Sequence, residues 1–127
     1  MPDSLDDFER TRADLNEEIL GCGHLGIKRF FALDHQAYEP GPLATKTKEL
    51  LGLVASTVLR CDDCITYHLV RSAEQGWSRE EVIDALNVAL VVGDSITIPH
   101  VRRAFARMRK IKGLQPAQNA DLRPPIK

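Results

Sequence analysis

The sequence predicts an all-α protein of about six helices, because apolar side chains recur with the helical period along most of the chain. No segment alternates apolar and polar residues in the manner of a strand, and no Asn-Gly or Asp-Gly hairpin turn is present. At 127 residues the chain has the size of one ordinary domain. We therefore expect a single helical domain over residues 1–127.

The first two helices are bounded by clear start and stop signals. Ser4 can cap the first helix, with Asp7 three residues later, and this helix is expected to end at residues 21–23, Gly-Cys-Gly. The second helix is expected over residues 25–38. It ends where residues 39–42, Glu-Pro-Gly-Pro, interrupt the helical pattern, since proline cannot continue a helix.

The third helix is expected to run from Pro42 to about Arg60. Between Leu50 and Leu59 most residues are strongly apolar. A helix that is apolar nearly all round is usually buried, so we expect this helix to lie at the centre of the fold.

The fourth helix is expected to begin near Asp62 and to end at Gly76, which suits the left-handed position after a helix. Ser78 then caps the fifth helix, whose first turn is acidic. After a break at residues 93–95, a short basic helix is expected to end near Gly113. The proline-containing tail, residues 114–127, is expected to be poorly ordered or to wrap a neighbour.

Composition and charge narrow the classes of function. Hydrophobic residues make up 43% and charged residues 28% of the chain, as in soluble globular proteins. Seventeen basic and eighteen acidic residues give a net charge of -1, which argues against nucleic acid or an anionic membrane as the main partner. The N-terminus lacks a secretory signal, and no apolar run is long enough to cross a bilayer. We therefore expect a cytoplasmic protein that acts on a small molecule or on another protein.

The clearest chemical signal is a C-x-x-C pair at the start of the predicted fourth helix. Cys61 and Cys64 are followed by His68, and the spacings of three and four residues place these side chains on one helical face. The N–H groups and the dipole at a helix N-terminus stabilise a thiolate and lower its pKa. The two thiols can thus act as a reversible two-electron switch, in which one attacks and the other resolves.

A carboxylate precedes this pair. Glu49 lies twelve residues before Cys61, at the edge of the apolar run of the third helix. An ionised group cannot be buried without a partner at acceptable cost. Glu49 therefore either reaches solvent or is held by a partner, for which His68 is the candidate.

The spacing of Glu49, Cys61, Cys64 and His68 resembles that of the family that includes the alkylhydroperoxidase AhpD and carboxymuconolactone decarboxylase. The resemblance covers residues 42–100. It implies a helical AhpD-like fold and a thiol-dependent peroxidase of the antioxidant, peroxiredoxin-like kind. In that activity Cys64 attacks a hydroperoxide and becomes a sulfenic acid, Cys61 condenses with it to a disulfide, and Glu49 and His68 relay the proton.

The resemblance also implies partners. They are a hydroperoxide substrate and a dithiol or thioredoxin-like reductant, and no cofactor or metal is expected. AhpD is longer and has two related helical halves, whereas this chain contains only the motif-bearing half. Short chains of this kind resemble family members that assemble, so we expect a homo-oligomer, a trimer or a hexamer.

One departure from the family pattern lies between the cysteines. AhpD has a histidine where this chain has Asp63, next to Asp62. Two carboxylates beside the thiols raise the free energy of a thiolate and oppose the effect of the helix dipole. We therefore expect low or narrow peroxidase activity.

Other interpretations stay open. A zinc site would use the C-x-x-C and His68, with a fourth ligand chosen from Cys22, His24, His35 and His100, but the tight glycine-containing turn of zinc knuckles is missing. Carboxymuconolactone decarboxylation needs no dithiol, and the decarboxylases lack this C-x-x-C. A non-enzymatic redox sensor, whose disulfide state alters assembly, is the third alternative.

Three further residues are given structural interpretations. Cys22 is expected to be a small residue in a tight turn. His100 is expected to start a helix with a solvated basic face formed with Arg102 and Arg103. Trp77 is expected to pack across the corner between the fourth and fifth helices.

Overall fold

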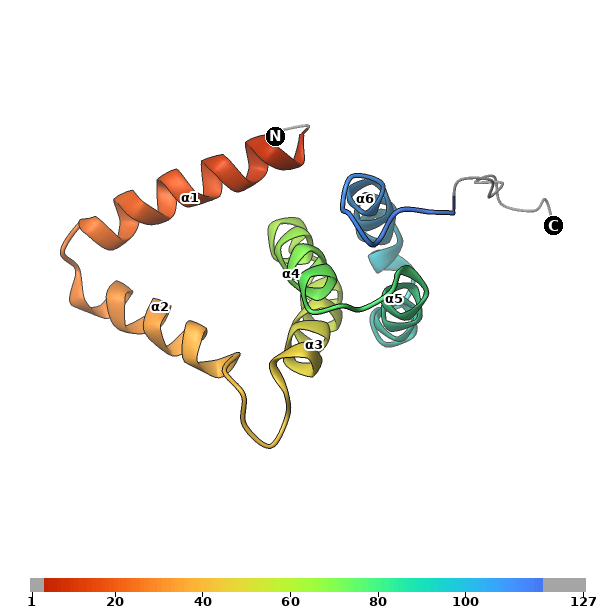
Figure 1. Cartoon of the computed structure of the whole chain (residues 1–127), viewed down its shortest axis with the longest axis horizontal. Helices are drawn as coiled ribbons and strands as arrows, with labels where there is room; N and C mark the ends of the chain where they lie inside the picture. The colour runs from red at the N-terminus through yellow and green to blue at the C-terminus, as the bar shows by residue number, and fades with distance from the viewer. Residues whose placement is uncertain (1–3, 118–127) are drawn as a thin grey trace. The chain divides into compact units, whose positions relative to one another are not determined.

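The computed structural model describes residues 4–117, which form six α-helices and one short 3-10 helix with no strand among them (Figure 1). The predicted all-α class is confirmed. The helices are α1 (Leu5–Gly21), α2 (Leu25–Ala37), α3 (Thr45–Val58), α4 (Asp62–Glu74), α5 (Arg79–Gly93), η1 (Ser95–Thr97) and α6 (Ile98–Met108).

The chain separates into two compact units, divided between Thr45 and Lys46. In the first unit, α1 begins at the predicted cap, where the Ser4 hydroxyl accepts a hydrogen bond of 3.0 Å from the backbone N–H of Asp7. The cap of α2 was not predicted: His24 Nδ1 accepts from the backbone N–H of Ile27 at 3.2 Å. The expectation of one domain stays a prediction.

The second unit has its own apolar core. Within it α4 packs against α6, and α6 also packs against α5 (Figure 1). The core side chains are Leu53, Ile65, Leu69, Val82, Ala85, Leu86, Ala89, Ala104, Met108, Ile111 and Leu114. These residues come from α3 to α6 and from the segment after α6, so the candidate cysteine helix α4 is supported on its inner face.

The corner between α4 and α5 follows the sequence prediction closely. Gly76 has a φ of +91°, and the N–H of Trp77 donates back to the carbonyl of Ser72 at 3.1 Å, which ends α4. Ser78 and Glu81 then form a reciprocal capping box at the start of α5. The indole N–H of Trp77 donates to the carbonyl of Lys46 at 2.7 Å, so this corner is also tied to the start of α3.

Two predictions about α3 are wrong. The helix begins at Thr45 rather than Pro42. It is also not buried all round, because Leu51 is 54% exposed and Leu53 is the one buried apolar side chain of the helix. Leu59, which directly follows the helix, is 77% exposed. The buried face otherwise carries polar groups, namely Glu49, Ser56 and Thr57. An apolar run reports composition and cannot tell how many sides of a helix are covered.

The end of the chain also differs from expectation. Helix α6 ends at Met108, earlier than the predicted end near Gly113. Leu114 is fully buried, and its carbonyl accepts a hydrogen bond of 2.9 Å from Arg79, so the predicted disorder is wrong where the tail begins. The rest of that prediction, from residue 118 onward, lies outside the described residues.

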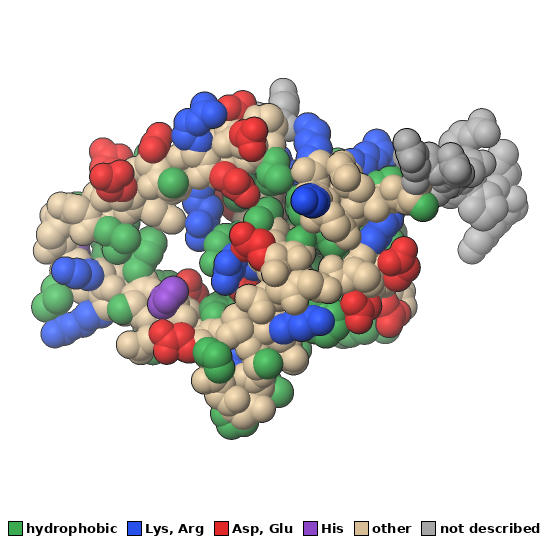
Figure 2. Space-filling model, in the orientation of Figure 1, with side chains coloured by type: hydrophobic (Ala, Val, Ile, Leu, Met, Phe, Trp, Pro, Cys, Tyr) green, Lys and Arg blue, Asp and Glu red, His purple; other side chains and the backbone are tan. Residues whose placement is uncertain are grey.

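The surface carries charges of both signs. Lys and Arg side chains are interspersed with Asp and Glu across the face seen in Figure 2. Among the helices of the described chain, residues 4–117, none has the length and apolar character needed to span a bilayer.

Candidate redox site

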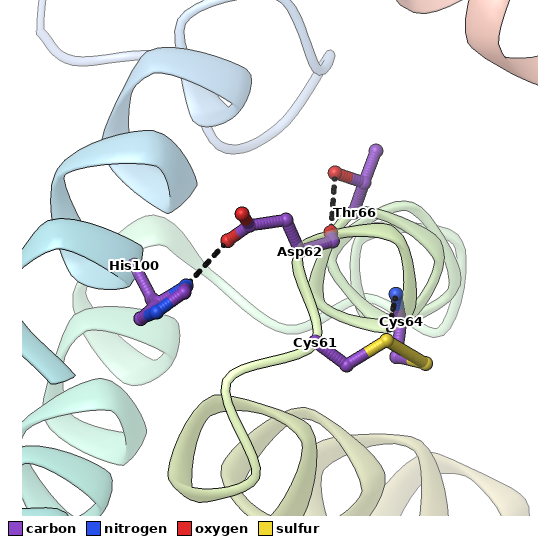
Figure 3. The surroundings of a disulfide bond; sticks show 5 residues. All are labelled: Cys61, Asp62, Cys64, Thr66 and His100. Carbon is purple, nitrogen blue, oxygen red and sulfur yellow. Dashed lines mark hydrogen bonds and ion pairs between the residues drawn. A yellow bond between two sulfur atoms is a disulfide. The ribbon is translucent and has the colours of Figure 1, made fainter. Parts of the chain in front are cut away.

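The cysteine pair lies where the sequence predicts, at the N-terminus of α4 (Figure 3). Cys61 is the N-cap residue and Cys64 lies in the first turn, and their sulfurs form a disulfide. The Cα atoms are 5.3 Å apart, within the usual range for a disulfide. The backbone N–H of Cys64 also points at Cys61 Sγ, at 3.3 Å. Cys64 is exposed, so a substrate or reductant can reach this sulfur.

The turn that precedes the pair explains its position. The N–H groups of Arg60 and Cys61 donate to the carbonyls of Thr57 and Ser56, each at 3.0 Å, and this pattern ends α3. Such a turn needs one left-handed residue, and that residue is Arg60, with a φ of +61°. Because glycine is usual at this position and arginine stands here, the tight connection could not be predicted from the sequence. The turn places Cys61 at the cap of the next helix without an intervening loop.

Behind the cysteines, Glu49 and His68 form the predicted pair. His68 Nδ1 lies 3.2 Å from Glu49 Oε1, and the two residues are 7% and 1% exposed. His68 is four residues after Cys64 and therefore lies one turn further along the same face of α4. The ring of Tyr67 stands edge-on to the imidazole, with centroids 5.1 Å apart.

Arg71 is a third member of this cluster, and it was not predicted from the sequence. Its Nε donates to the other carboxylate oxygen of Glu49 at 3.4 Å, and its Nη1 donates to Glu74 at 2.7 Å. Burial lowers the pKa of Arg71, but the hydrogen bond and negative charge of Glu74 outweigh that effect, so the pKa lies above its ordinary value. Glu49 thus has a permanent cation as well as an imidazole beside it. The spacing of Arg71 three residues after His68 was the available signal.

The two carboxylates beside the thiols, Asp62 and Asp63, differ in their surroundings. Asp62 Oδ1 lies 2.8 Å from His100 Nδ1 (Figure 3), and Asp62 Oδ2 accepts from Arg103 Nη1 at 3.0 Å. Asp63, by contrast, is exposed. His100 lies in the first turn of α6 as expected, but its imidazole is only 17% exposed and is not part of a solvated face. The sequence could not reveal this contact, because the partners are about forty residues apart.

The arrangement of the possible ligand side chains does not support the zinc interpretation. Within residues 4–117, no three His, Cys, Asp or Glu side chains are grouped so that they could hold a metal ion. Of the proposed fourth ligands, His24 caps α2, His100 is paired with Asp62, and Cys22 is an exposed free thiol at the end of α1.

Together, a disulfide in the first turn of a helix and a buried carboxylate–imidazole pair on the next turn define an all-α dithiol protein. The model of the carboxymuconolactone decarboxylase family matches residues 27–107. The chain belongs to this family, as the spacing of the site residues predicts.

Comparisons with individual proteins agree with the family. The chain is 27% identical over 84 residues to "Uncharacterized protein 4 in cox locus" of Paracoccus denitrificans, which covers 66% of this chain and 76% of that protein. Two crystal structures of TM1620 from Thermotoga maritima are also similar. They are 59% and 60% identical, with TM-scores of 0.76 and 0.78, and each comparison covers 80% of this chain and 86% or 89% of the other. TM1620 is a carboxymuconolactone decarboxylase family protein "possibly involved in antioxidative response".

Proposed function

We propose that this protein is a thiol-dependent peroxidase that reduces hydroperoxides through Cys61 and Cys64. The observation that carries the proposal is the disulfide at the start of α4 with the buried Glu49–His68 pair one turn behind it. A peroxidase of this type needs a reachable sulfur, a second sulfur within bonding distance and a group that accepts and returns a proton. The first turns of α4 supply all three.

The proposed cycle balances with a dithiol as reductant. The Cys64 thiolate attacks one oxygen of ROOH, the O–O bond breaks, and ROH leaves after taking up a proton, so that Cys64 becomes a sulfenic acid. The Cys61 thiol then attacks the Cys64 sulfur, and water leaves as the disulfide forms. A dithiol returns two electrons and two protons by thiol–disulfide exchange and is itself oxidised to a disulfide.

His68 is the proposed proton carrier. With Nδ1 bonded to Glu49, the imidazole is held in one orientation and Nε2 is the nitrogen that exchanges a proton with the thiol. Glu49 stabilises the imidazolium that forms, and Arg71 keeps Glu49 in place. Glu49 and Arg71 are positioning residues because they act on the sulfur through His68.

The relatives support this reading in a limited way. The antioxidative role suggested for TM1620 fits a hydroperoxide substrate, and that protein shares 59% of aligned residues with this chain. A cytoplasmic location would supply the reducing thiols that the cycle needs.

The test is consumption of hydrogen peroxide and of a bulkier alkyl hydroperoxide with dithiothreitol as reductant. We expect sustained turnover by the native chain and by Cys22→Ser, loss of turnover in Cys64→Ser, and strong reduction in Cys61→Ser. A single oxidation to the disulfide without turnover would contradict the proposal and favour a redox sensor. Turnover of a carboxymuconolactone by both cysteine variants would instead favour the decarboxylase alternative.

We also propose that the protein assembles as a homo-oligomer, a trimer or a hexamer, through the apolar surface of α5 and η1. Val88, Val91, Val92 and Ile96 are between 52% and 76% exposed there. A second copy of the chain is the proposed partner because a group of exposed apolar side chains is typical of an interface between protein chains. Light scattering should show a trimer or hexamer for the native chain and a smaller species for Val91→Glu. A native monomer would overturn this part of the proposal.

A further inference from the structure

The carboxylate of Asp62 is bonded to side chains of another helix, α6. Asp62 is the first residue of α4 and directly follows Cys61, whereas His100 and Arg103 lie one turn apart on α6. Each oxygen of the carboxylate has its own partner, which is His100 at 2.8 Å (Figure 3) for one and Arg103 at 3.0 Å for the other. The backbone carbonyl of Asp62 also accepts from the Thr66 hydroxyl at 3.0 Å. Both the side chain and the backbone of this residue are therefore fixed.

The neighbouring carboxylate provides a contrast within the same helical turn. Asp63 is exposed, and no salt bridge involves it among the described residues. The other ionisable groups near the cysteines are those of His68, Glu49 and Arg71. The charge of Asp62 is thus offset by α6, while the charge of Asp63 is left to solvent.

A bare carboxylate beside the cysteines would oppose a thiolate there, since like charges at short range repel. Pairing with a cation cancels most of that repulsion. The same contacts hold Asp62, which is the first residue of α4 and directly follows Cys61. One contact between α4 and α6 therefore has two consequences for the sulfurs, one geometric and one electrostatic.

We propose that Asp62 is a positioning residue whose hydrogen bond with His100 and ion pair with Arg103 anchor the start of α4 on α6 and offset a negative charge that would otherwise disfavour the cysteine thiolate. The inference rests on the proposed redox function of the pair, but not on a particular substrate. It makes α6 part of the redox site, although α6 contributes no reacting atom.

The test is a titration of the thiolates in the reduced protein, followed by their ultraviolet absorbance, in a Cys22→Ser background so that only the pair contributes. Arg103→Gln removes a cation and leaves Asp62 less compensated, so the lower thiol pKa should rise by about 0.3 to 0.5 units, a two- to threefold loss of thiolate. Asp62→Asn removes the anion and keeps the Arg103 cation, so the pKa should fall by about the same amount. Both shifts should shrink at about 1 M salt.

Asp63→Asn is the matched control. It makes the same change of charge one residue away without breaking an ion pair, so it should lower the thiol pKa slightly and leave thermal stability unchanged. A purely structural role for Asp62 would lower stability in Asp62→Asn and Arg103→Gln without opposite pKa shifts, and that result would overturn the inference. Because Arg103 is 56% exposed, its variant is expected to fold.

The equilibrium with reduced and oxidised dithiothreitol gives a second readout. In this exchange the protein disulfide gains two electrons and two protons, and the reagent becomes a cyclic disulfide. Stabilising the thiolate favours the reduced protein, so Asp62→Asn should be more reduced than native at a fixed ratio, and Arg103→Gln more oxidised. The titration requires no turnover, so it decides the inference even if the chain consumes no peroxide and the proposed function fails.

Discussion

Replacing Glu49 with glutamine tests the buried cluster behind the cysteines. The change keeps the size of the side chain but removes the charge that faces His68 at 3.2 Å and Arg71 at 3.4 Å. The carboxylate no longer contributes its charge to either hydrogen bond, and Glu49 is only 1% exposed, so water cannot replace that contribution. Both contacts are long, and the Arg71 side chain is 36% exposed, which reduces the loss for that contact. We expect a loss of unfolding free energy of about 1 to 3 kcal/mol.

The loss of stability has a measurable counterpart in thermal unfolding. For a chain of this size, 1 kcal/mol corresponds to about 3 to 6 °C, so the midpoint followed by circular dichroism should fall by about 3 to 18 °C. Peroxidase activity should fall by about 100-fold, because His68 loses the group that orients it and stabilises its charged form.

Arg71→Gln is the control for this experiment. It weakens the support of Glu49 but leaves the contact with His68, so its effects on stability and activity should be smaller than those of Glu49→Gln. Unchanged stability and activity in Glu49→Gln would refute the assignment of a buried, functional carboxylate–imidazole pair. Loss of stability with full activity would refute only the proton-relay role.

Three further predictions concern the rest of the fold. Arg60→Gly should stabilise the protein by about 0.5 to 1 kcal/mol in urea unfolding, because a φ of +61° is unfavourable for arginine and easy for glycine; destabilisation would contradict the strain argument. Leu114→Ala should lower the free energy of unfolding by about 2 to 4 kcal/mol in the same assay, because this side chain is fully buried. An effect near zero would mean that residue 114 belongs to a poorly ordered tail. The hydrogen bonds from the backbone and side chain of Ser78 lower the pKa of Glu81 below its ordinary value of 4.5. A carboxyl with a lowered folded pKa contributes stability above its unfolded pKa and loses it as the pH falls through the folded pKa, so native and Glu81→Gln should differ in stability at pH 7 and converge in acid.

The helical class and most helix ends could be predicted because their signals are local. Ser4, Gly76 and Ser78 act on backbone groups within a few residues, and the structure confirms each one. The Glu49–His68 contact could also be predicted, since a carboxylate at the edge of an apolar run needs a partner and His68 was the ionisable group in register with the cysteines.

The failures share a different cause, which is that they depend on packing between distant segments. The exposure of Leu51 and Leu59 depends on which sides of α3 are covered, and the burial of Leu114 depends on α5. The pairing of Asp62 with His100 and Arg103 arises only when α4 lies against α6. Sequence spacing therefore predicted that Cys61, Cys64, Glu49 and His68 lie together, but it did not predict the partners of Asp62.

The most direct test of the proposed role of Cys64 is to trap the product of the first chemical step. In the Cys61→Ser variant the resolving thiol is absent, so one equivalent of an alkyl hydroperoxide should leave a sulfenic acid on Cys64, which dimedone and peptide mass spectrometry would locate. We expect a dimedone adduct on Cys64 and little adduct on Cys22. An adduct confined to Cys22, or none at either cysteine, would contradict Cys64 as the peroxide-reducing group.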